Sequence, residues 1–321
     1  MLQAVLLFAL GLVLLIKGGD WFVDGATGIA RRFHVPELLI GATVVSIGTT
    51  IPEVMVSATS ALGGHGEIAY GNAIGSVICN TALIAAITMA VRPSSVPRKA
   101  ILTPVAFFFG AAVLYAAVAY TTGYFSRWIG ILMLVIFVAY ILLCVRNARR
   151  SPAPSEEEAA PEKEAPLLHH IGLLVVGAAL IAVGANLLVD NGTIIATELG
   201  VPEAVIALTF VALGTSLPEL VTAITALAKG HSDLSLGNVI GANLFNLVLV
   251  SGTATTLAPF QIPVSRTIAG MNASLVVDIP VMILVMALMC IPALRKERIY
   301  RWQGILLLCI YAAFCVFQFM V

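Results

Sequence analysis

Apolar runs long enough to cross a lipid bilayer recur along the whole chain, separated by short segments of charged and turn-forming residues. We count ten, near residues 2–27, 37–62, 68–90, 100–120, 126–146, 168–190, 203–228, 233–257, 276–293 and 302–320. A membrane-spanning helix needs about 20 mostly apolar residues. The pattern therefore predicts an all-α integral membrane protein with ten transmembrane helices.

Three aspartates at the ends of these runs are predicted to lie near the membrane interfaces. Asp278 is followed by Pro280, a combination typical of a helix start, so we expect it to cap the ninth helix. Asp24 and Asp190, late in the first and sixth runs, are expected to be caps at the interface.

Composition supports the membrane class and excludes others. The 321 residues are 60% hydrophobic and only 11% charged, with a mean hydropathy of +1.03, which is too apolar for one soluble core. The net charge is zero and the basic residues gather at segment ends, so nucleic acid is not an expected partner. No HExxH or GxSxG motif and no metal-binding Cys/His spacing occurs. We expect no enzyme activity, no cofactor and no obligatory protein partner, with the lipid bilayer and inorganic cations as the binding partners.

Two short polar segments interrupt the apolar pattern and belong to an internal repeat. Residues 48–53 read GTTIPE and residues 214–219 read GTSLPE. One ungapped shift of 166 residues aligns them and also aligns the following pairs: Asp24/Asp190, Pro36/Pro202, Glu37/Glu203, Thr43/Thr209, Gly64/Gly230, His65/His231, Gly71/Gly237, Asn72/Asn238, Gly75/Gly241 and Asn80/Asn246. Chance does not keep one register over so many unusual residues.

The repeat defines two halves of opposite orientation. Each half holds five spans, and because five is odd the second half must enter the membrane upside down relative to the first, as in many secondary transporters. We therefore predict two inverted five-helix repeats, residues 1–147 and 167–321. They are joined by a solvated cytoplasmic linker, residues 148–166, that contains four prolines and five glutamates.

Loop charges orient the chain. With the first inter-helix loop in the cytoplasm, two loop residues, Arg127 and Arg266, fall outside. Fourteen fall inside: Arg31, Arg32, Arg92, Arg98, Lys99, Arg146, Arg149, Arg150, Lys163, Lys229, Arg295, Lys296, Arg298 and Arg301. By the positive-inside rule, we predict a multi-pass protein of the cell (inner) membrane with both termini on the outer side.

The polar segments suit a cation. An ionised glutamate deep in the bilayer costs a few kcal/mol, so Glu53 and Glu219 imply a compensating positive charge. Pro52 and Pro218 are expected to interrupt their helices and free the carbonyls near residues 46–49 and 212–215. Further oxygens are expected from Thr49, Thr50, Thr215, Ser216, Ser76, Asn80 and Asn246. An all-oxygen set of this flexibility favours Ca²⁺ over Mg²⁺.

Charge balance then indicates exchange. One Ca²⁺ cancels the two carboxylates, and two or three Na⁺ can occupy the same oxygens. If only a loaded site can move between the two faces, competition couples the ions. A proton- or potassium-coupled calcium exchanger remains an alternative, and a passive cation channel a more distant one.

The same residues carry a resemblance to a known family. GATVVSIGTTIPE with GNAIGSVICN, and ALTFVALGTSLPE with GNVIGANLFN, resemble the two alpha-repeats of the cation/calcium exchanger superfamily, in its prokaryotic sodium/calcium exchanger branch. The resemblance implies alternating-access antiport of Ca²⁺ and Na⁺, with Glu53 and Glu219 as the central ligands. It also implies that Ser46 and Ala212 contribute backbone oxygens, and it supports the other oxygens named above. Three positions depart from the family pattern: Ala242 in place of a common serine, Asn246 in place of aspartate in some members, and Thr50 in place of the usual serine.

Overall fold

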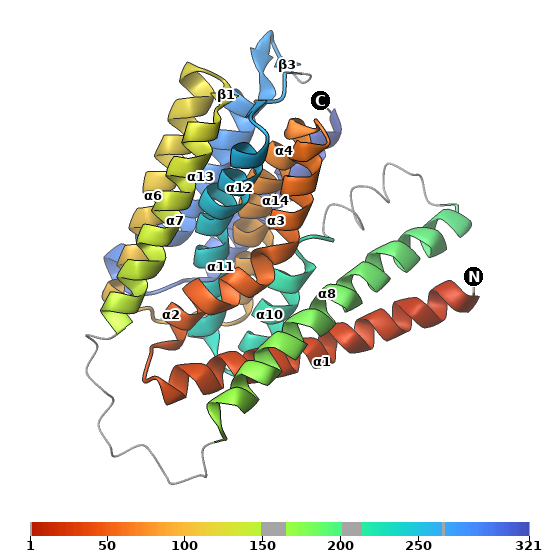
Figure 1. Ribbon diagram of the computed structural model, residues 1–321, viewed down its shortest axis with the longest axis vertical. Helices are drawn as coiled ribbons and strands as arrows, with labels where there is room; N and C mark the ends of the chain where they lie inside the picture. The colour runs from red at the N-terminus through yellow and green to blue at the C-terminus, as the bar shows by residue number, and fades with distance from the viewer. Residues whose placement is uncertain (1, 149–164, 201–213, 265–266, 321) are drawn as a thin grey trace.

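The computed structural model describes residues 2–148, 165–200, 214–264 and 267–320, which are almost entirely helical (Figure 1). Within these ranges nine helices are long and apolar enough to cross a membrane, and the shorter apolar helix Leu217–Ala228 occupies the position of the seventh span. The predicted all-α membrane fold is confirmed.

In the described part of the chain, the α-helices of the spans are interrupted in four places by π-helical turns, labelled η. The first half contains α1 (Leu2–Arg32), α2 (Glu37–Ile40), η1 (Gly41–Val45), α3 (Ser46–Leu62), α4 (Gly66–Cys79), η2 (Asn80–Ala85), α5 (Ala86–Val91), α6 (Arg98–Thr121) and α7 (Arg127–Ala148). The second half contains α8 (Leu167–Glu198), α10 (Leu217–Ala228), α11 (Ser232–Phe245), η5 (Asn246–Val250), α12 (Ser251–Leu257), η6 (Ser274–Asp278), α13 (Ile279–Lys296) and α14 (Arg301–Met320).

Helices α1 and α8 form a long pair that crosses beside the main bundle (Figure 1). A Cβ atom built on Gly11 would lie 2.9 Å from the Gly184 oxygen, and one built on Gly18 would lie 2.9 Å from the Gly177 oxygen. Residues later in α1 contact residues earlier in α8, so the two helices are antiparallel. The 166-residue shift relates Gly11 to Gly177 and Gly18 to Gly184, so it converts the Gly11–Gly184 contact into the Gly18–Gly177 contact. A two-fold axis between the inverted halves requires this equivalence.

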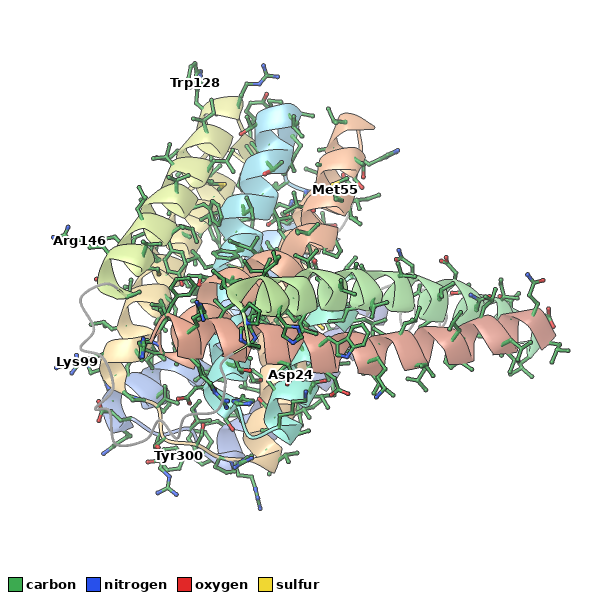
Figure 2. The ribbon with its side chains drawn as sticks, turned by 60° about the horizontal axis from the view of Figure 1, so that its bottom comes forward. Asp24, Met55, Lys99, Trp128, Arg146 and Tyr300 are labelled. Carbon is green, nitrogen blue, oxygen red and sulfur yellow. The ribbon has the colours of Figure 1, made fainter. Side chains whose placement is uncertain are left out.

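Short strand pairings mark the two ends of the bundle. At one end β1 (Tyr124–Phe125) pairs with β2 (Phe260–Gln261), and β3 (Thr267–Ile268) pairs with β4 (Met271–Asn272). At the other end Ser95 pairs with Arg298. Trp128 and Tyr300 accordingly lie at opposite ends of the molecule (Figure 2). This arrangement agrees with the predicted alternation of loops between the two sides.

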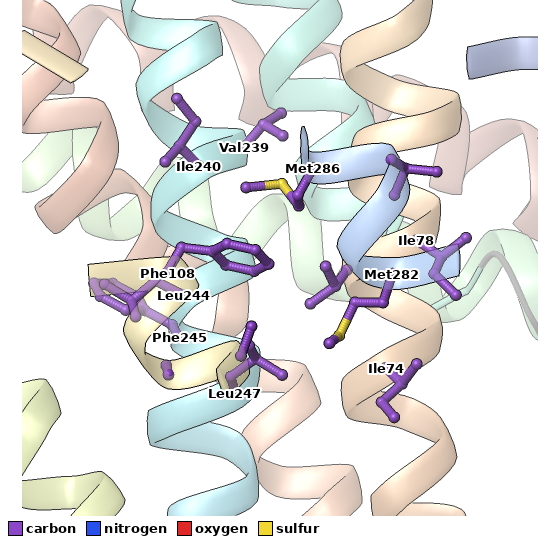
Figure 3. Packing of buried hydrophobic residues seen from close by; sticks show 14 of the residues in the cluster. Ile74, Ile78, Phe108, Val239, Ile240, Leu244, Phe245, Leu247, Met282 and Met286 are labelled. Carbon is purple, nitrogen blue, oxygen red and sulfur yellow. The ribbon is translucent and has the colours of Figure 1, made fainter. Parts of the chain in front are cut away.

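The centre of the bundle is a dense apolar core. Side chains of α4, α6, α11 and α13 interdigitate there, with Ile78 and Phe108 facing Met282 and Leu244 across the core (Figure 3). The run Ser232–Leu257 is the most enclosed, since 94% of its most apolar window is buried. Large apolar side chains on α1, α7 and α8 are exposed instead, as expected for surfaces that face lipid.

The aspartates predicted to be caps lie inside helices, so those predictions are wrong. Residue 278 has helical dihedrals and makes no capping bond; η6 runs through it into α13. Its carboxylate accepts hydrogen bonds from Ser274 Oγ and Gln318 Nε2, both at 2.9 Å. Asp24 lies two turns before the end of α1 and pairs with Lys229 at 2.8 Å. Asp190 likewise lies within α8, which ends at Glu198.

Candidate ion-binding site

The two glutamates of the repeated motif lie on α3 and α10, deep inside the bundle. The exposed fraction of both Glu53 and Glu219 is 0%. Helices α3 and α10 pack against each other. Two acidic side chains from opposite halves of the chain therefore face one enclosed region, which we call the cage.

Hydroxyl groups surround the glutamates. Thr49, Thr50 and Ser216 are buried, and Thr215 is half-buried. Thr49 Oγ1 donates a hydrogen bond to Asn238 Oδ1 at 3.3 Å. The motif GT[T/S]xPE occurs in both halves with the same spacing, so in each half two neighbouring hydroxyl residues lie about one turn before the glutamate.

Pro52 does not interrupt its helix, contrary to the sequence-based expectation. Residues Ser46–Leu62 form a continuous α-helix that contains Pro52. The irregularity lies about two turns earlier, at η1, where the backbone widens to a π-helical turn. Because proline has no N–H, the Gly48 carbonyl still has no amide partner four residues on.

The second half does show an interruption at its proline. Residues 214–216 form a turn, and α10 begins at Leu217 with Pro218 in its first turn. The Gly214 carbonyl, which has no amide on Pro218 to accept from, accepts a hydrogen bond from Leu217 N at 3.4 Å instead. Residues before 214, including the candidate ligand Ala212, lie outside the described residues.

Asparagines from the third and eighth spans lie at repeat-equivalent positions, on π-helical turns that contact the helices of the two glutamates: η2 packs against α10, and η5 packs against α3. Asn80 is the first residue of η2 and Asn246 is the first residue of η5, and both are 0% exposed. Bulges of the π type occur frequently at functional sites. Ser76, one turn before Asn80, is also buried, at 4% exposure.

Asn238 is a site residue that the sequence-based ligand set missed. Its Oδ1 accepts hydrogen bonds from Thr49 Oγ1 and Ser46 Oγ, both at 3.3 Å, and its main-chain oxygen accepts from Ser46 Oγ at 2.9 Å. Ser46 Oγ also lies 2.7 Å from the Gly41 oxygen in η1. The Ser46 hydroxyl is therefore used in packing, and its main-chain oxygen lies 3.5 Å from Thr49 Oγ1. The alignment of Asn238 with Asn72 was the signal for this residue.

The cage contains buried polar atoms without partners. Within the described residues, both carboxylate oxygens of Glu53 and of Glu219 lack a hydrogen-bond partner, as do Thr50 Oγ1 and the amide groups of Asn80 and Asn246. Such groups are rare in folded proteins and call for an explanation, because desolvation without a partner costs several kcal/mol. Carboxylate, amide and hydroxyl oxygens are the donors that Ca²⁺ and Na⁺ use, so the residues present fit a hard cation.

A cavity of about 190 Å³ connects this region with the α1/α8 pair. It lies between Thr49, Pro52 and Pro218 on the cage side and Phe22 and Ile181 on the other. Phe22 also lies against Gly48, where a built Cβ would be 3.0 Å from its Cζ atom. A movement of α1 and α8 would therefore change the wall of the cage directly.

Comparison with known proteins agrees with this geometry. The sodium/calcium exchanger protein family matches residues 3–146 and 169–320. The inner membrane protein YrbG of Escherichia coli K12 is 36% identical and covers 82% of this chain and 82% of its own length. The sodium/calcium exchanger MaX1 of Methanosarcina acetivorans is 30% identical and covers 98% of both chains. Structures of the sodium-calcium exchanger NCX_Mj superpose with a TM-score of 0.80 at 33% identity and cover 97% of both chains. The chain belongs to the sodium/calcium exchanger protein family.

Proposed function

We propose that this protein is a secondary antiporter that exchanges Ca²⁺ for Na⁺ across the membrane, with both ions as cargo of one cage. The observation that carries the proposal is the pair Glu53 and Glu219, fully buried, unpaired within the described residues, and contributed by the two inverted halves. Membership of the exchanger family and the likeness to NCX_Mj support the same activity. No resident cofactor, bond-making step or partner protein is needed.

The cage can couple the two ions through charge. One Ca²⁺ neutralises the two carboxylates, and two or three Na⁺ bind with help from the neutral oxygens of Thr49, Asn80 and Asn246. Empty, the two carboxylates repel each other in a region of low dielectric, which opposes movement between the faces. Since only a loaded cage moves readily, each ion crosses in exchange for the other.

The proposed ligand set is the one that the sequence indicates. It comprises Glu53, Glu219, Thr49, Thr50, Thr215, Ser216, Ser46, Ala212, Ser76, Asn80 and Asn246. Buried positions around the two glutamates support nine of these; Thr215 is half-buried and Ala212 lies outside the described residues. Asn238 is assigned to hold Thr49 and Ser46 in place.

Calcium flux into proteoliposomes tests the function. We expect uptake of radioactive Ca²⁺ when Na⁺ is trapped inside and diluted outside, and no uptake when K⁺ or a pH gradient replaces the Na⁺ gradient. Ca²⁺ uptake driven by a K⁺ or proton gradient alone would show that K⁺ or H⁺ is the coupling ion in place of Na⁺. Ca²⁺ leakage that needs no gradient of another ion would favour a passive channel.

We also propose the predicted orientation, with both termini on the outer side of the inner membrane, the segment 148–166 in the cytoplasm, and the halves 1–147 and 167–321 as the two inverted units. Fourteen of the sixteen basic loop residues then face the cytoplasm. Pairing between loops at each end of the bundle supports the alternation.

Reporter fusions check this orientation. A reporter that is active only in the cytoplasm is expected to work when inserted at residues 155–160 and to fail when fused after residue 321. A periplasm-specific reporter at the same positions should give the opposite pattern. Cytoplasmic activity at the C-terminus would contradict the orientation.

A further inference from the structure

Three buried side chains form a polar cluster inside the apolar core, where the two halves of the chain meet. Asn243 on α11 donates hydrogen bonds from Nδ2 to Thr81 Oγ1 at 2.7 Å and to Met286 Sδ at 3.1 Å. Thr81 on η2 donates from Oγ1 to Met286 Sδ at 3.2 Å. All three side chains are 0% exposed, and Met286 of α13 lies among the core residues of Figure 3. We call these three residues the brace, because they join η2 of the first half to α11 and α13 of the second.

The brace connects the segments that carry the two candidate asparagine ligands. Thr81 directly follows Asn80 in η2. Asn243 precedes Asn246 by three residues, which is about one helical turn. Because α11 and η2 also pack against each other, the bond between Thr81 and Asn243 fixes the separation of these two segments beside the candidate ligands.

The internal repeat shows that the fold does not require polar residues at these positions. The 166-residue shift relates Thr81 to Leu247. It relates Asn243 to Val77. Both apolar residues are 0% exposed, and their elements, η5 and α4, pack against each other. The same place in the other half of the architecture is therefore packed without hydrogen bonds.

The brace also carries an energetic penalty. Asn243 Oδ1 is buried and has no hydrogen-bond partner within the described residues. Loss of hydration without a replacement partner is destabilising. A polar pair that lowers stability, at a position where an apolar pair is accommodated in the other half, is expected to serve the site rather than the fold.

We propose that Thr81 and Asn243 are positioning residues that determine which divalent cations the cage accepts. They act by holding Asn80 and Asn246 at a fixed separation. The proposal rests on the proposed function, because it takes the cage as the place where Ca²⁺ binds.

The physical basis is the rigidity of a hydrogen bond. Oxygen sites discriminate between hard cations through cavity size, ligand number and flexibility. A hydrogen bond restricts both the distance and the direction of its two groups, whereas the hydrophobic effect has no preferred direction. Ba²⁺ is larger than Ca²⁺, so the cage must widen to hold it. The brace is therefore expected to disfavour Ba²⁺.

The first test measures the Ba²⁺ concentration, relative to that of unlabelled Ca²⁺, which halves the uptake of radioactive Ca²⁺ into proteoliposomes. The double variant Thr81→Leu/Asn243→Val gives the brace the two residues of its repeat equivalent. We expect the ratio of the two half-inhibitory concentrations to fall roughly threefold or more, on the scale of the net contribution of one hydrogen bond. Thr81→Val should lower the ratio as well, and Thr81→Ser, which keeps the hydroxyl, should retain the wild-type ratio.

Leu247→Val is the matched control, because it changes core packing at the repeat-equivalent position without removing a hydrogen bond. Its Ba²⁺/Ca²⁺ ratio should equal that of the wild type. The double variant should unfold at the wild-type temperature or higher, because replacing both hydrogen-bond partners by apolar groups can be neutral or stabilising. An unchanged ratio in both the double variant and Thr81→Val, even if total uptake falls, would show that the brace only supports packing and would overturn the proposal.

The second test needs no transport. Thermal unfolding of the purified protein in Na⁺-free buffer measures binding, because a cation that binds the folded state raises its unfolding temperature. Ca²⁺ should stabilise the wild type at lower concentrations than Ba²⁺ does, and this difference should shrink in the double variant but not in Leu247→Val. Equal differences in the wild type and the double variant would also overturn the proposal. Absence of Na⁺-driven Ca²⁺ uptake in the wild type would instead refute the proposed function, with the binding measurement still deciding on the brace.

Discussion

Glu53→Gln and Glu219→Gln are each expected to abolish sodium-driven calcium uptake. Glutamine keeps the size of the side chain and removes one of the two charges that balance Ca²⁺ in a fully buried cage. A charge pair about 4 Å apart is worth on the order of 4 kcal/mol at an effective dielectric constant of about 20. Loss of only half of that energy lowers occupancy roughly 30-fold, so uptake should fall below about 3% of the wild type.

A surface glutamate provides the control for this experiment. Glu67 lies exposed in the first turn of α4. Glu67→Gln should transport like the wild type, and all three variants should elute from a sizing column as the wild type does. Near-normal uptake in either cage variant, in protein that elutes normally, would remove that glutamate from the ligand set.

The fold was predictable because two independent patterns agreed. Apolar runs set the number of spans, and the 166-residue register links Gly11 with Gly177 and Gly18 with Gly184. In the α1/α8 crossing Gly11 meets Gly184 and Gly18 meets Gly177. The exact ends of the helices were harder to predict from the sequence. Helix α1 continues to Arg32 rather than stopping near 27, because an arginine-bearing last turn can reach past the apolar region into solvent.

The burial of Glu53 and Glu219 was predictable from the sequence, whereas the backbone around them was only partly so. Proline at position 52 suggested a break, but a proline-containing helix can persist where neighbouring helices pack around it and re-satisfy freed groups. The actual irregularities are the π-helical turns η1, η2 and η5. Their sequences, GATVV, NTALIA and NLVLV, are mostly apolar, and no local signal in them separates a π-helical turn from an α-helical one. Tertiary contacts, such as Ser46 with Asn238, accompany them.

Asn238 and Cys79 show a second limit of sequence reasoning. Asn238 lies in GNVIG and Cys79 lies in GSVIC, yet the contacts of both depend on which neighbour their side chains face. Asn238 faces Thr49 and Ser46 of the other half, 189 and 192 residues away in sequence. Cys79 faces Tyr311 of the last helix, 232 residues away. Contacts of that range follow from the packing of the halves and not from any short motif.

Gly177→Leu is expected to reduce sodium-driven calcium uptake to below roughly one tenth of the wild type, because leucine cannot be accommodated in the α1/α8 crossing. A Cβ atom built on Gly177 would lie 2.5 Å from Phe22 N and 2.8 Å from the Gly18 oxygen. Both are main-chain atoms that cannot turn aside, so the helices must separate, and overpacking of this kind typically costs about 1–3 kcal/mol. The displaced Phe22 lines the cavity beside the cage, so the change reaches the ions.

Gly172→Leu is the matched control for this change, because Gly172 lies on the same helix and a Cβ built there meets nothing within 4 Å. Both substitutions raise helix propensity equally, so propensity cannot account for a difference between them. Uptake should be near normal in Gly172→Leu and intermediate in Gly177→Ala, whose single methyl group forces a smaller displacement. Thermal unfolding followed by size-exclusion chromatography separates the two ways in which Gly177→Leu can act. A variant that stays folded but does not transport indicates that α1 and α8 must remain in close contact while they move. Normal transport by folded Gly177→Leu would show that the close crossing of α1 and α8 is not needed for exchange.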